Sequence, residues 1–386
     1  MGFGRRAVED LVMFGGAFSG RSVFITGHTG FKGAWLTSWL LGLGAEVTGY
    51  ALEPPTEPSL FDELGLGARL RHVVADVRDR DRLAKEMAAA RPSVVFHLAA
   101  QPLVRRGYVE PQETFATNIM GTVDVLEAAR ACDAVAAIVV VTSDKCYDNA
   151  ETGRAFREED PLGGRDPYSA SKGCAELVTA SYRASFFDAD GSAAVASVRA
   201  GNVIGGGDWA PDRIIPDCAR ALAAGEPVIV RNPDAVRPWQ HVLEPLAGYL
   251  WLAAGLVRDG AVFTGPWNFG PTDDDASRSV RWVVEAFLGE WGAGSWAALE
   301  DRAGQPPEAG RLRLDSSKAR ELLSWAPVWD AAAAVRNTAA WYRDYYQRAG
   351  GARELVEDQL RAYESAARTA GLAWAGSTTD AHGRSG

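Results

Sequence analysis

Short apolar runs alternate with longer helical patterns over the first two hundred residues. The clearest run is 138–141, four successive β-branched residues, with polar side chains directly after it. A run of this composition is typical of a parallel strand buried on both faces. Further strands are predicted at 22–26, 45–51, 72–75, 93–100 and 195–199, and helices at 34–41, 79–90, 111–131 and from residue 167 onward. This alternation predicts an α/β fold, a doubly wound parallel sheet with helices on both faces.

Thr142, Ser143, Asp144 and Lys145 follow the 138–141 strand. Open α/β sheets bind ligands in the crevice beyond the carboxyl ends of their strands, so this polar group is a candidate active site. A Thr-Ser-Asp sequence also caps turns, and the run by itself does not separate the two readings.

A glycine turn follows the strand predicted at 22–26. Gly27, Gly30 and Gly33 lead from this strand into a helical pattern, with the spacing G-x-x-G-x-x-G. In this context glycines let the backbone approach a pyrophosphate at a helix N-terminus, although a tight turn without a ligand is the alternative. Glu53 stands near the place of an acidic ribose partner, and no arginine lies between Gly33 and Arg69 to pair with a 2′-phosphate. NAD is therefore favoured over NADP.

Pro167 begins a helix that places Tyr168 and Lys172 four residues apart on one face. A nearby ammonium favours phenolate and lowers a tyrosine pKa from its usual value of about 10. The pair is expected to accept the proton of an alcohol that is being oxidised. An ordinary exposed helix pair is the alternative, and Ser143 and the glycine turn favour the catalytic reading.

Three other polar residues interrupt apolar patterns. Asp76 is predicted either to accept a hydrogen bond from adenine or to cap the following helix. His97, in an apolar strand, is predicted to be a hydrogen-bonded core histidine. Asn118, on an apolar helix face, is predicted either to brace the sheet or to position the catalytic residues.

In their order and spacing these motifs resemble the extended short-chain dehydrogenase/reductase family. The resemblance rests on Gly27-x-x-Gly30-x-x-Gly33, Asp76-Val77, His97-Leu-Ala-Ala100, Asn118 and Tyr168-x-x-x-Lys172. The longer strings 27–33, 142–147, 200–209 and 237–242 resemble its 4,6-dehydratase branch, in particular the members that act on CDP-glucose, and the match runs from about residue 12 to 348. The resemblance implies a Rossmann-type sheet, bound NAD, and a homodimer or homotetramer in which helices 111–131 and 168–186 pair across a twofold axis.

The resemblance also implies a set of site residues. The implied catalytic residues are Ser143, Asp144, Lys145, Tyr168 and Lys172. The implied cofactor contacts are Gly27, Thr29, Gly30, Phe31, Lys32, Gly33, Asp76, Val77, Leu98, Ala99, Ala100, Asn118, Tyr168 and Lys172. The implied substrate contacts are Gln101, Asn202, Arg213, Arg231 and Arg237. Guanidinium forks match the oxygens of a diphosphate, although a surface salt bridge is the commoner fate of a single arginine.

The implied reaction is a redox-neutral 4,6-dehydration of a nucleotide-activated hexose, with CDP-D-glucose as the favoured substrate. Tyr168 would take the C4 hydroxyl proton, and Asp144 would protonate the leaving C6 hydroxyl. Lys145 stands where related dehydratases carry glutamate, and would act either as a base or as a charged stabiliser of an enolate. The alternatives are a dehydratase for a dTDP-, UDP- or GDP-hexose, a 4-epimerase or dehydrogenase, and a non-catalytic NAD-binding protein.

The composition of the chain bears on its partners, its metal and disulfide content and its location. The chain has 40 basic and 50 acidic residues, a net charge of −10, which argues against a nucleic-acid partner. Its four cysteines lack a C-x-x-C spacing, so no metal site and no disulfide framework are expected. No run of eighteen apolar residues occurs, and the N-terminus lacks the apolar core of a signal peptide, so a cytoplasmic protein with no membrane partner is expected.

The pattern becomes less regular after residue 200, which predicts a smaller, mixed C-terminal substrate domain. We predict an N-terminal extension at 1–20, an NAD-binding domain with the catalytic residues at 21–200, a nucleotide-sugar domain at 201–348 with segments that return to the first domain, a C-terminal helix at 349–374 and a disordered tail at 375–386. The segments 267–271 and 312–315 are assigned to the smaller domain. Pro307 stands where a relative more usually carries histidine, which weakens the assignment of a substrate lid.

Overall fold

A computed structural model describes residues 12–149, 153–189, 191–272, 278–299, 312–347 and 351–376. Residues 1–11 of the predicted extension, Pro307 and residues 377–386 of the predicted tail lie outside this described part.

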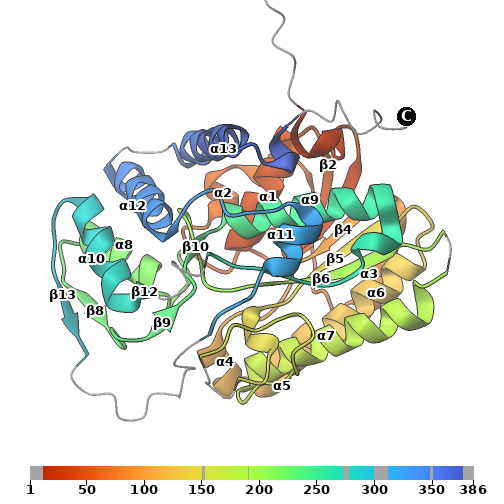
Figure 1. Ribbon diagram of the computed structural model, residues 1–386, viewed down its shortest axis with the longest axis horizontal. Coiled ribbons are helices and arrows are strands. Elements are labelled where there is room, and N and C mark those ends of the chain that lie inside the picture. Colours follow the sequence, from red (N-terminus) through yellow and green to blue (C-terminus); the bar gives the residue numbers. More distant parts are fainter. Residues whose placement is uncertain are drawn as a thin grey trace, which may run out of the picture.

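A seven-stranded parallel sheet forms the centre of the molecule (Figure 1). Its order is β11-β6-β5-β4-β1-β2-β3. The strands are β1 (Ser22–Thr26), β2 (Glu46–Ala51), β3 (Arg71–Val74), β4 (Val94–His97), β5 (Ala137–Val141), β6 (Ala194–Ala200) and β11 (Gly265–Phe269). The order reverses between β1 and β4, and such a switch point places a ligand crevice at the carboxyl ends of the strands. The predicted fold class is confirmed.

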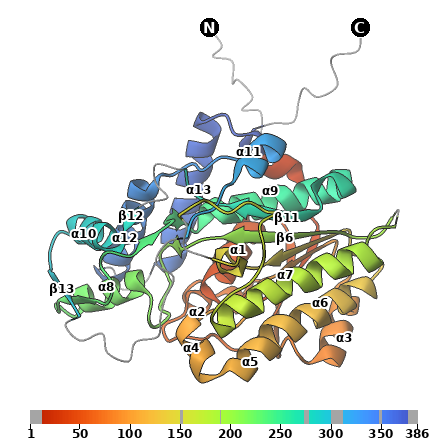
Figure 2. The same ribbon diagram turned by 60° about the horizontal axis from the view of Figure 1, so that its bottom comes forward.

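Helices cover both faces of this sheet (Figure 2). One face carries α3 (Arg80–Ala90), α6 (Gly121–Arg130) and α7 (Pro167–Phe186), and the other carries α1 (Phe31–Gly42) and α9 (Leu243–Asp259). The helix predicted at 111–131 is α5 (Pro111–Phe115), a π-helical turn (Ala116–Met120) and α6 in succession. Proline occupies the first turn of α7, and the side chain of Asp166 caps that helix by accepting from the Ser169 amide.

A smaller lobe stands at one end of the sheet, at the left of Figure 1. It contains α8 (Ile214–Ala223), α10 (Val280–Trp291), α12 (Ala331–Gln347) and the strand pairs β8 (Val228–Val230) with β13 (Trp296–Ala298) and β9 (Val236–Arg237) with β12 (Arg278–Ser279). The segment 267–271, which was predicted for this lobe, instead supplies most of β11 beside β6. That prediction was wrong because only the pairing with β6 identifies the segment as a strand of the main sheet. The division of the chain at residue 200 stays a prediction.

Helix α9 is the most apolar of the long helices. The stretch Leu243–Phe263 is long and apolar enough to cross a membrane by length and composition, but 67% of its apolar eighteen-residue segment is buried inside the protein. The helix lies against β5 and β6. This burial is typical of a helix that covers a central sheet.

The two ends of the described chain meet over α1. The ring of Phe14 stacks on Trp374 with their centroids 5.1 Å apart, and Trp39 of α1 contacts both rings. The indole of Trp39 also donates a 2.9 Å hydrogen bond to Glu364, on α13 (Ala352–Thr369). The described part of the predicted N-terminal extension therefore belongs to the hydrophobic core.

Candidate active site

A cavity of about 1210 Å³ lies between the carboxyl ends of the sheet and the smaller lobe. Pockets for one small molecule usually measure roughly 300–1,000 Å³, so this cavity has room for a dinucleotide together with a second nucleotide-sized ligand. Every site residue predicted from the sequence lines the cavity except Asn118.

The glycine turn has the shape of a pyrophosphate cradle. Gly27 has φ +77°, and a Cβ there would lie 2.6 Å from the Ala99 nitrogen; a Cβ on Gly33 would lie 2.2 Å from the Gly27 carbonyl oxygen. Gly30 is different, because a Cβ there would meet nothing nearer than 3.5 Å while the residue lines the cavity at the start of α1. The fold itself thus requires Gly27 and Gly33, and Gly30 leaves open the space where a helix N-terminus binds an anion. The residues present fit a dinucleotide.

Asp76 lines the adjoining part of the cavity and does not cap a helix. The cap of α3 is Asp79, whose carboxylate accepts from the Arg82 amide at 3.2 Å. Asp76 instead accepts hydrogen bonds from the backbone and side chain of Arg78, which lower the pKa of its carboxyl. Of the two predictions for Asp76, the helix cap was wrong.

Two histidines near the cradle are structural. His97 shares a 2.7 Å hydrogen bond with the Thr26 hydroxyl and a 3.1 Å bond with Thr122, so the predicted core role is confirmed. His28 bonds to His72 at 2.7 Å, and burial lowers the pKa of His28 to about 3. Burial also lowers the pKa of His97 to about 3, so the imidazoles of His28 and His97 are neutral at physiological pH.

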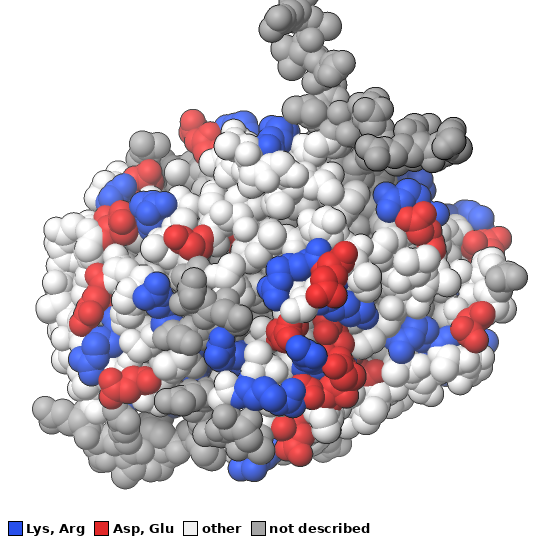
Figure 3. All heavy atoms as spheres, in the orientation of Figure 1, with Lys and Arg blue, Asp and Glu red and all other residues white. Residues whose placement is uncertain are grey.

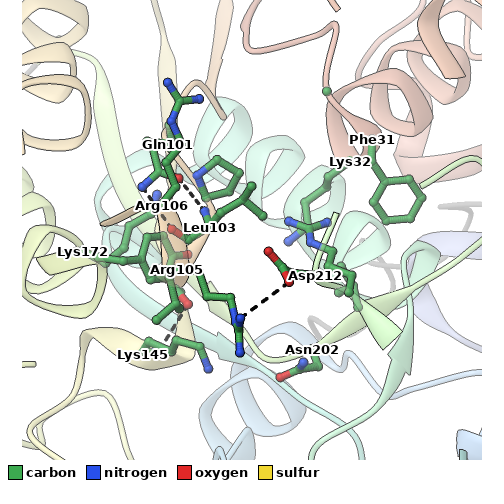
Figure 4. Close-up of a pocket in the computed structure, with 18 of the residues that line it drawn as sticks. Phe31, Lys32, Gln101, Leu103, Arg105, Arg106, Lys145, Lys172, Asn202 and Asp212 are labelled. Atoms are coloured by element: carbon green, nitrogen blue, oxygen red, sulfur yellow. Dashed lines mark hydrogen bonds and ion pairs between the residues drawn. The ribbon is translucent and has the colours of Figure 1, made fainter. Parts of the chain in front are cut away.

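The end of β5 and the start of α7 bring the predicted catalytic residues together. The Ser143 hydroxyl donates to the Asp144 carboxylate at 3.0 Å and is also hydrogen-bonded to the Tyr168 phenol. Lys172 donates a 3.2 Å hydrogen bond to the carbonyl of Val141, the last residue of β5. In Figure 4 Lys145 and Lys172 lie on the same side of the pocket as Gln101. The end of β5 and the first turn of α7 therefore lie close enough for Ser143 and Tyr168 to form a hydrogen bond.

The pKa of Tyr168 differs from the prediction. Burial raises it to about 12, and the hydrogen bond with Ser143 opposes this rise only in part. Burial also lowers the pKa of Lys172 to about 8. The prediction of a lowered tyrosine pKa was wrong for the protein alone, because desolvation outweighs the helix neighbour that the sequence makes obvious.

Asp144 has the properties of a proton donor. Its side chain is buried, and its Oδ2 atom has no hydrogen-bond partner among the described residues. Burial raises the pKa of this carboxyl, although the charge of Lys145 and the Ser143 hydrogen bond oppose the effect. A carboxyl that holds its proton in an apolar site is suited to general-acid catalysis.

A buried ion pair, which was not predicted, fixes both ends of the 142–147 segment. Arg199 of β6 and Glu176 of α7 lie 2.8 Å apart with their side chains almost fully buried. Thr142 donates its hydroxyl proton to Glu176, and Arg199 donates to the Tyr147 hydroxyl at 2.7 Å. The sequence contained one indication of this ion pair: Arg199 lies in the apolar strand predicted at 195–199, and a buried charge requires a partner of opposite charge.

Asn118 and Gln101 stabilise the loop after β4. The Asn118 amide exchanges hydrogen bonds with the backbone of Gln101 at 2.8 and 3.1 Å and donates to Ser171 of α7 at 2.8 Å. The Gln101 side chain bonds to Leu103 and to the Thr114 hydroxyl. Asn118 is buried and is not among the residues that line the cavity, so its predicted cofactor contact and its predicted positioning role both stay predictions.

The smaller lobe contributes a wall of arginines. Arg213 donates to Asp208 at 2.7 Å, Arg231 donates to Asp212, and Arg237 donates to the Val236 carbonyl at 2.9 Å. These three arginines and Asn202 line the same cavity as the glycine cradle. Arg213 lies near enough to Lys32 of the glycine turn for its charge to lower the pKa of that lysine. Guanidinium groups in this position are suited to phosphate oxygens.

The sheet order, the glycine cradle and the Ser143–Tyr168–Lys172 group define an NAD-dependent α/β enzyme of the short-chain dehydrogenase/reductase type. The model of the NAD dependent epimerase/dehydratase family matches residues 23–262, and the chain belongs to that family. NAD is the cofactor of this family, as predicted.

Individual relatives are more specific. The chain is 49% identical to the CDP-glucose 4,6-dehydratase of Salmonella typhimurium over 331 residues, which is 84% of this chain and 91% of the relative. It is 29% identical to the dTDP-glucose 4,6-dehydratase of Streptomyces griseus, over 84% of this chain and 94% of the relative. The solved structure of DesIV, a dTDP-glucose 4,6-dehydratase from Streptomyces venezuelae with NAD and TYD bound, superimposes with a TM-score of 0.71 at 25% identity and covers 84% of this chain and 98% of that one. The resemblance seen in the sequence is confirmed.

Substitution of Gly30 and of Gly33, two glycines of the same turn, is expected to affect different properties of the protein. We expect Gly30→Ala to fold with nearly unchanged thermal stability but to bind NAD at least tenfold more weakly, because the new methyl group enters the ligand space. Gly33→Ala is expected to lower the melting temperature by several degrees, because its methyl group meets backbone. Scanning calorimetry and NAD titration measure the two effects. Wild-type NAD affinity in Gly30→Ala would contradict the cradle assignment.

Proposed function

We propose that the protein catalyses the redox-neutral 4,6-dehydration of CDP-D-glucose to CDP-4-keto-6-deoxy-D-glucose. The observation that carries this proposal is the buried acid Asp144 beside the Ser143–Tyr168 pair. A 4-epimerase or a simple dehydrogenase needs the serine, tyrosine and lysine but no such acid. The 49% identity to a CDP-glucose 4,6-dehydratase supports the same reaction.

The glycine cradle, Asp76 and the residues after β4 would hold the cofactor along the first half of the sheet. When bound, NAD supplies a positively charged hydride acceptor that takes the C4 hydrogen and returns it at C6. Tyr168 takes the C4 hydroxyl proton. Its pKa of about 12 means that the phenol needs positive charge nearby to ionise, and the charge of Arg213 already acts in this direction.

Asp144 then acts on the other end of the sugar. Once C4 is a ketone, the hydrogen at C5 is acidic and water can be lost across C5 and C6. Asp144 donates its proton to the departing C6 hydroxyl, for which the free Oδ2 atom and the raised pKa are suited. The hydrogen bond from Ser143 to Oδ1 keeps the carboxyl group oriented toward the site.

The arginines of the smaller lobe would bind the diphosphate. Arg213, Arg231 and Arg237 present guanidinium groups to the cavity from three separate segments, which suits a ligand with several phosphate oxygens. Asn202 lines the same cavity. Gln101 also lines it and stabilises the loop after β4 through its hydrogen bond to Leu103.

We further propose that the enzyme works in the cytoplasm without a nucleic-acid or membrane partner. The net charge of −10 supports this. On the face shown in Figure 3, basic and acidic side chains are interspersed among the described residues. A large patch of basic side chains, as a polyanion would require, does not occur on that face.

The nucleobase and the reaction class are tested together by offering CDP-, dTDP-, UDP- and GDP-hexoses to the purified enzyme with NAD. We expect CDP-glucose to give the alkaline absorbance of a 4-keto sugar fastest, with no accumulation of NADH. Asp144→Asn should lower kcat by about 10²- to 10⁴-fold, because it removes the acid without changing the size of the side chain. Stoichiometric NADH would indicate a dehydrogenase, and turnover of dTDP- or GDP-hexose alone would refute the choice of CDP-glucose.

The role of Lys145 is tested by replacing it with methionine. Solvent deuterium enters C5 of a 4-keto-6-deoxy nucleotide sugar only if a base removes that hydrogen. We expect Lys145→Met to lower the exchange rate by at least tenfold. Unchanged exchange would exclude the role of Lys145 as the base.

We also propose that α5, α6 and α7 form the interface of a homodimer or a dimer of dimers. Four large apolar side chains are exposed along these neighbouring helices, Phe115, Met120, Leu177 and Phe186. Figure 2 shows these helices on the outside of the sheet. A group of this kind marks a protein interface.

Light scattering after gel filtration tests the interface. Leu177→Asp should shift the mass toward the monomer, whereas Leu322→Asp, an equally exposed position (58% against 59%) on α11 (Ser317–Leu323), should not. A monomeric wild-type protein, or an unchanged mass in Leu177→Asp, would refute the proposal.

A further inference from the structure

Two of the arginines proposed for the diphosphate already have carboxylate partners. Arg213 is paired with Asp208 at 2.7 Å. Arg231 is paired with Asp212 and lies 3.8 Å from Asp217. The charges of these two guanidinium groups are therefore largely neutralised by Asp208 and Asp212 before a diphosphate binds.

Asp208 is a fixed part of the wall. Its side chain is 7% exposed, and its carboxylate accepts from the Ala210 amide at 3.0 Å as well as from Arg213. The hydroxyl of Tyr342, on α12, donates to its backbone carbonyl. Asp208 therefore orients Arg213 from a position that it cannot easily leave.

Asp212 is held differently. Its side chain is 42% exposed, and its backbone has φ +63°, a left-handed conformation that side chains rarely adopt. Arg231 bonds to both its carboxylate and its backbone carbonyl, the latter at 2.8 Å. Arg105 of α4 (Val104–Val109) approaches the same carboxylate to 3.9 Å from the opposite wall.

These three residues line the cavity, and Figure 4 shows the Arg105–Asp212 ion pair extending between its two sides. Arg105 follows the main sheet, and Arg231 follows β8 of the smaller lobe. The Asp212 carboxylate is thus an anion on a loop, in the part of the site where two arginines converge.

We propose that Asp212 is an affinity-setting residue that competes with the substrate diphosphate for Arg231 and Arg105. The proposal rests on the proposed nucleotide-sugar site. A phosphate oxygen must replace the Asp212 carboxylate on these guanidinium groups, and the displaced side chain, already half-exposed, returns to solvent. Weakly charged ligands are excluded because they cannot make this exchange, and the charged product leaves more readily because Asp212 reoccupies its partners.

The test is Asp212→Asn, since asparagine tolerates the left-handed backbone and removes only the charge. Calorimetric titration with CDP should show binding about two- to tenfold tighter than in the wild type, with a steeper loss of affinity as salt is added, because the carboxylate charge that competes with phosphate for both arginines is gone. Asp160→Asn is the matched control, because it breaks a 2.7 Å pair with Arg154 outside the cavity, and its CDP affinity should equal that of the wild type.

CDP binding to Asp212→Asn that is equal to or weaker than wild-type binding would overturn the inference, because Asp212 would then belong to the ligand cradle or lie away from the diphosphate. Failure of the wild type itself to bind CDP at millimolar concentration is a separate result. That result would contradict the proposed function and with it this inference.

Discussion

The buried ion pair between Glu176 and Arg199 is the interaction on which the active site most depends. Further hydrogen bonds to the two side chains offset the cost of burying their charges. Glu176 accepts from Thr142 and Ser197, and Arg199 donates to Tyr147 and to the Glu158 carbonyl. Tyr147 in turn donates to Asn268 at the edge of the sheet. Strands β5, β6 and β11 and helix α7 are thereby joined beneath the catalytic loop.

This arrangement explains how the site combines opposite demands. The loop 142–147 has to present polar groups to a sugar and still be buried. Anchoring both of its ends to one ion pair allows its middle to be buried without losing shape. This burial raises the pKa of Asp144 and also that of Tyr168, so it favours the protonated form of both groups.

The sequence was sufficient to predict the parallel sheet and to select the glycine turn, Ser143 and Tyr168 as residues of one cavity, because each depends on local patterns: apolar runs, glycine spacing and a pair four residues apart. What it missed depends on distant partners. Strand β11 is identified only by its pairing with β6, and the inward direction of Asn118 only by its contacts with Gln101 and Ser171. The pKa of Tyr168 depends on total burial, which neighbours in the sequence do not reveal.

The stacking of Phe14 on Trp374 has a consequence for how the protein is made. Helix α1, whose first turn forms the cofactor cradle, is covered on its outer side by residues from both ends of the chain. Chains fold as they leave the ribosome, amino-terminal part first. The outer packing of α1 is therefore complete only after Trp374 has been synthesised, more than three hundred residues after the helix that it covers.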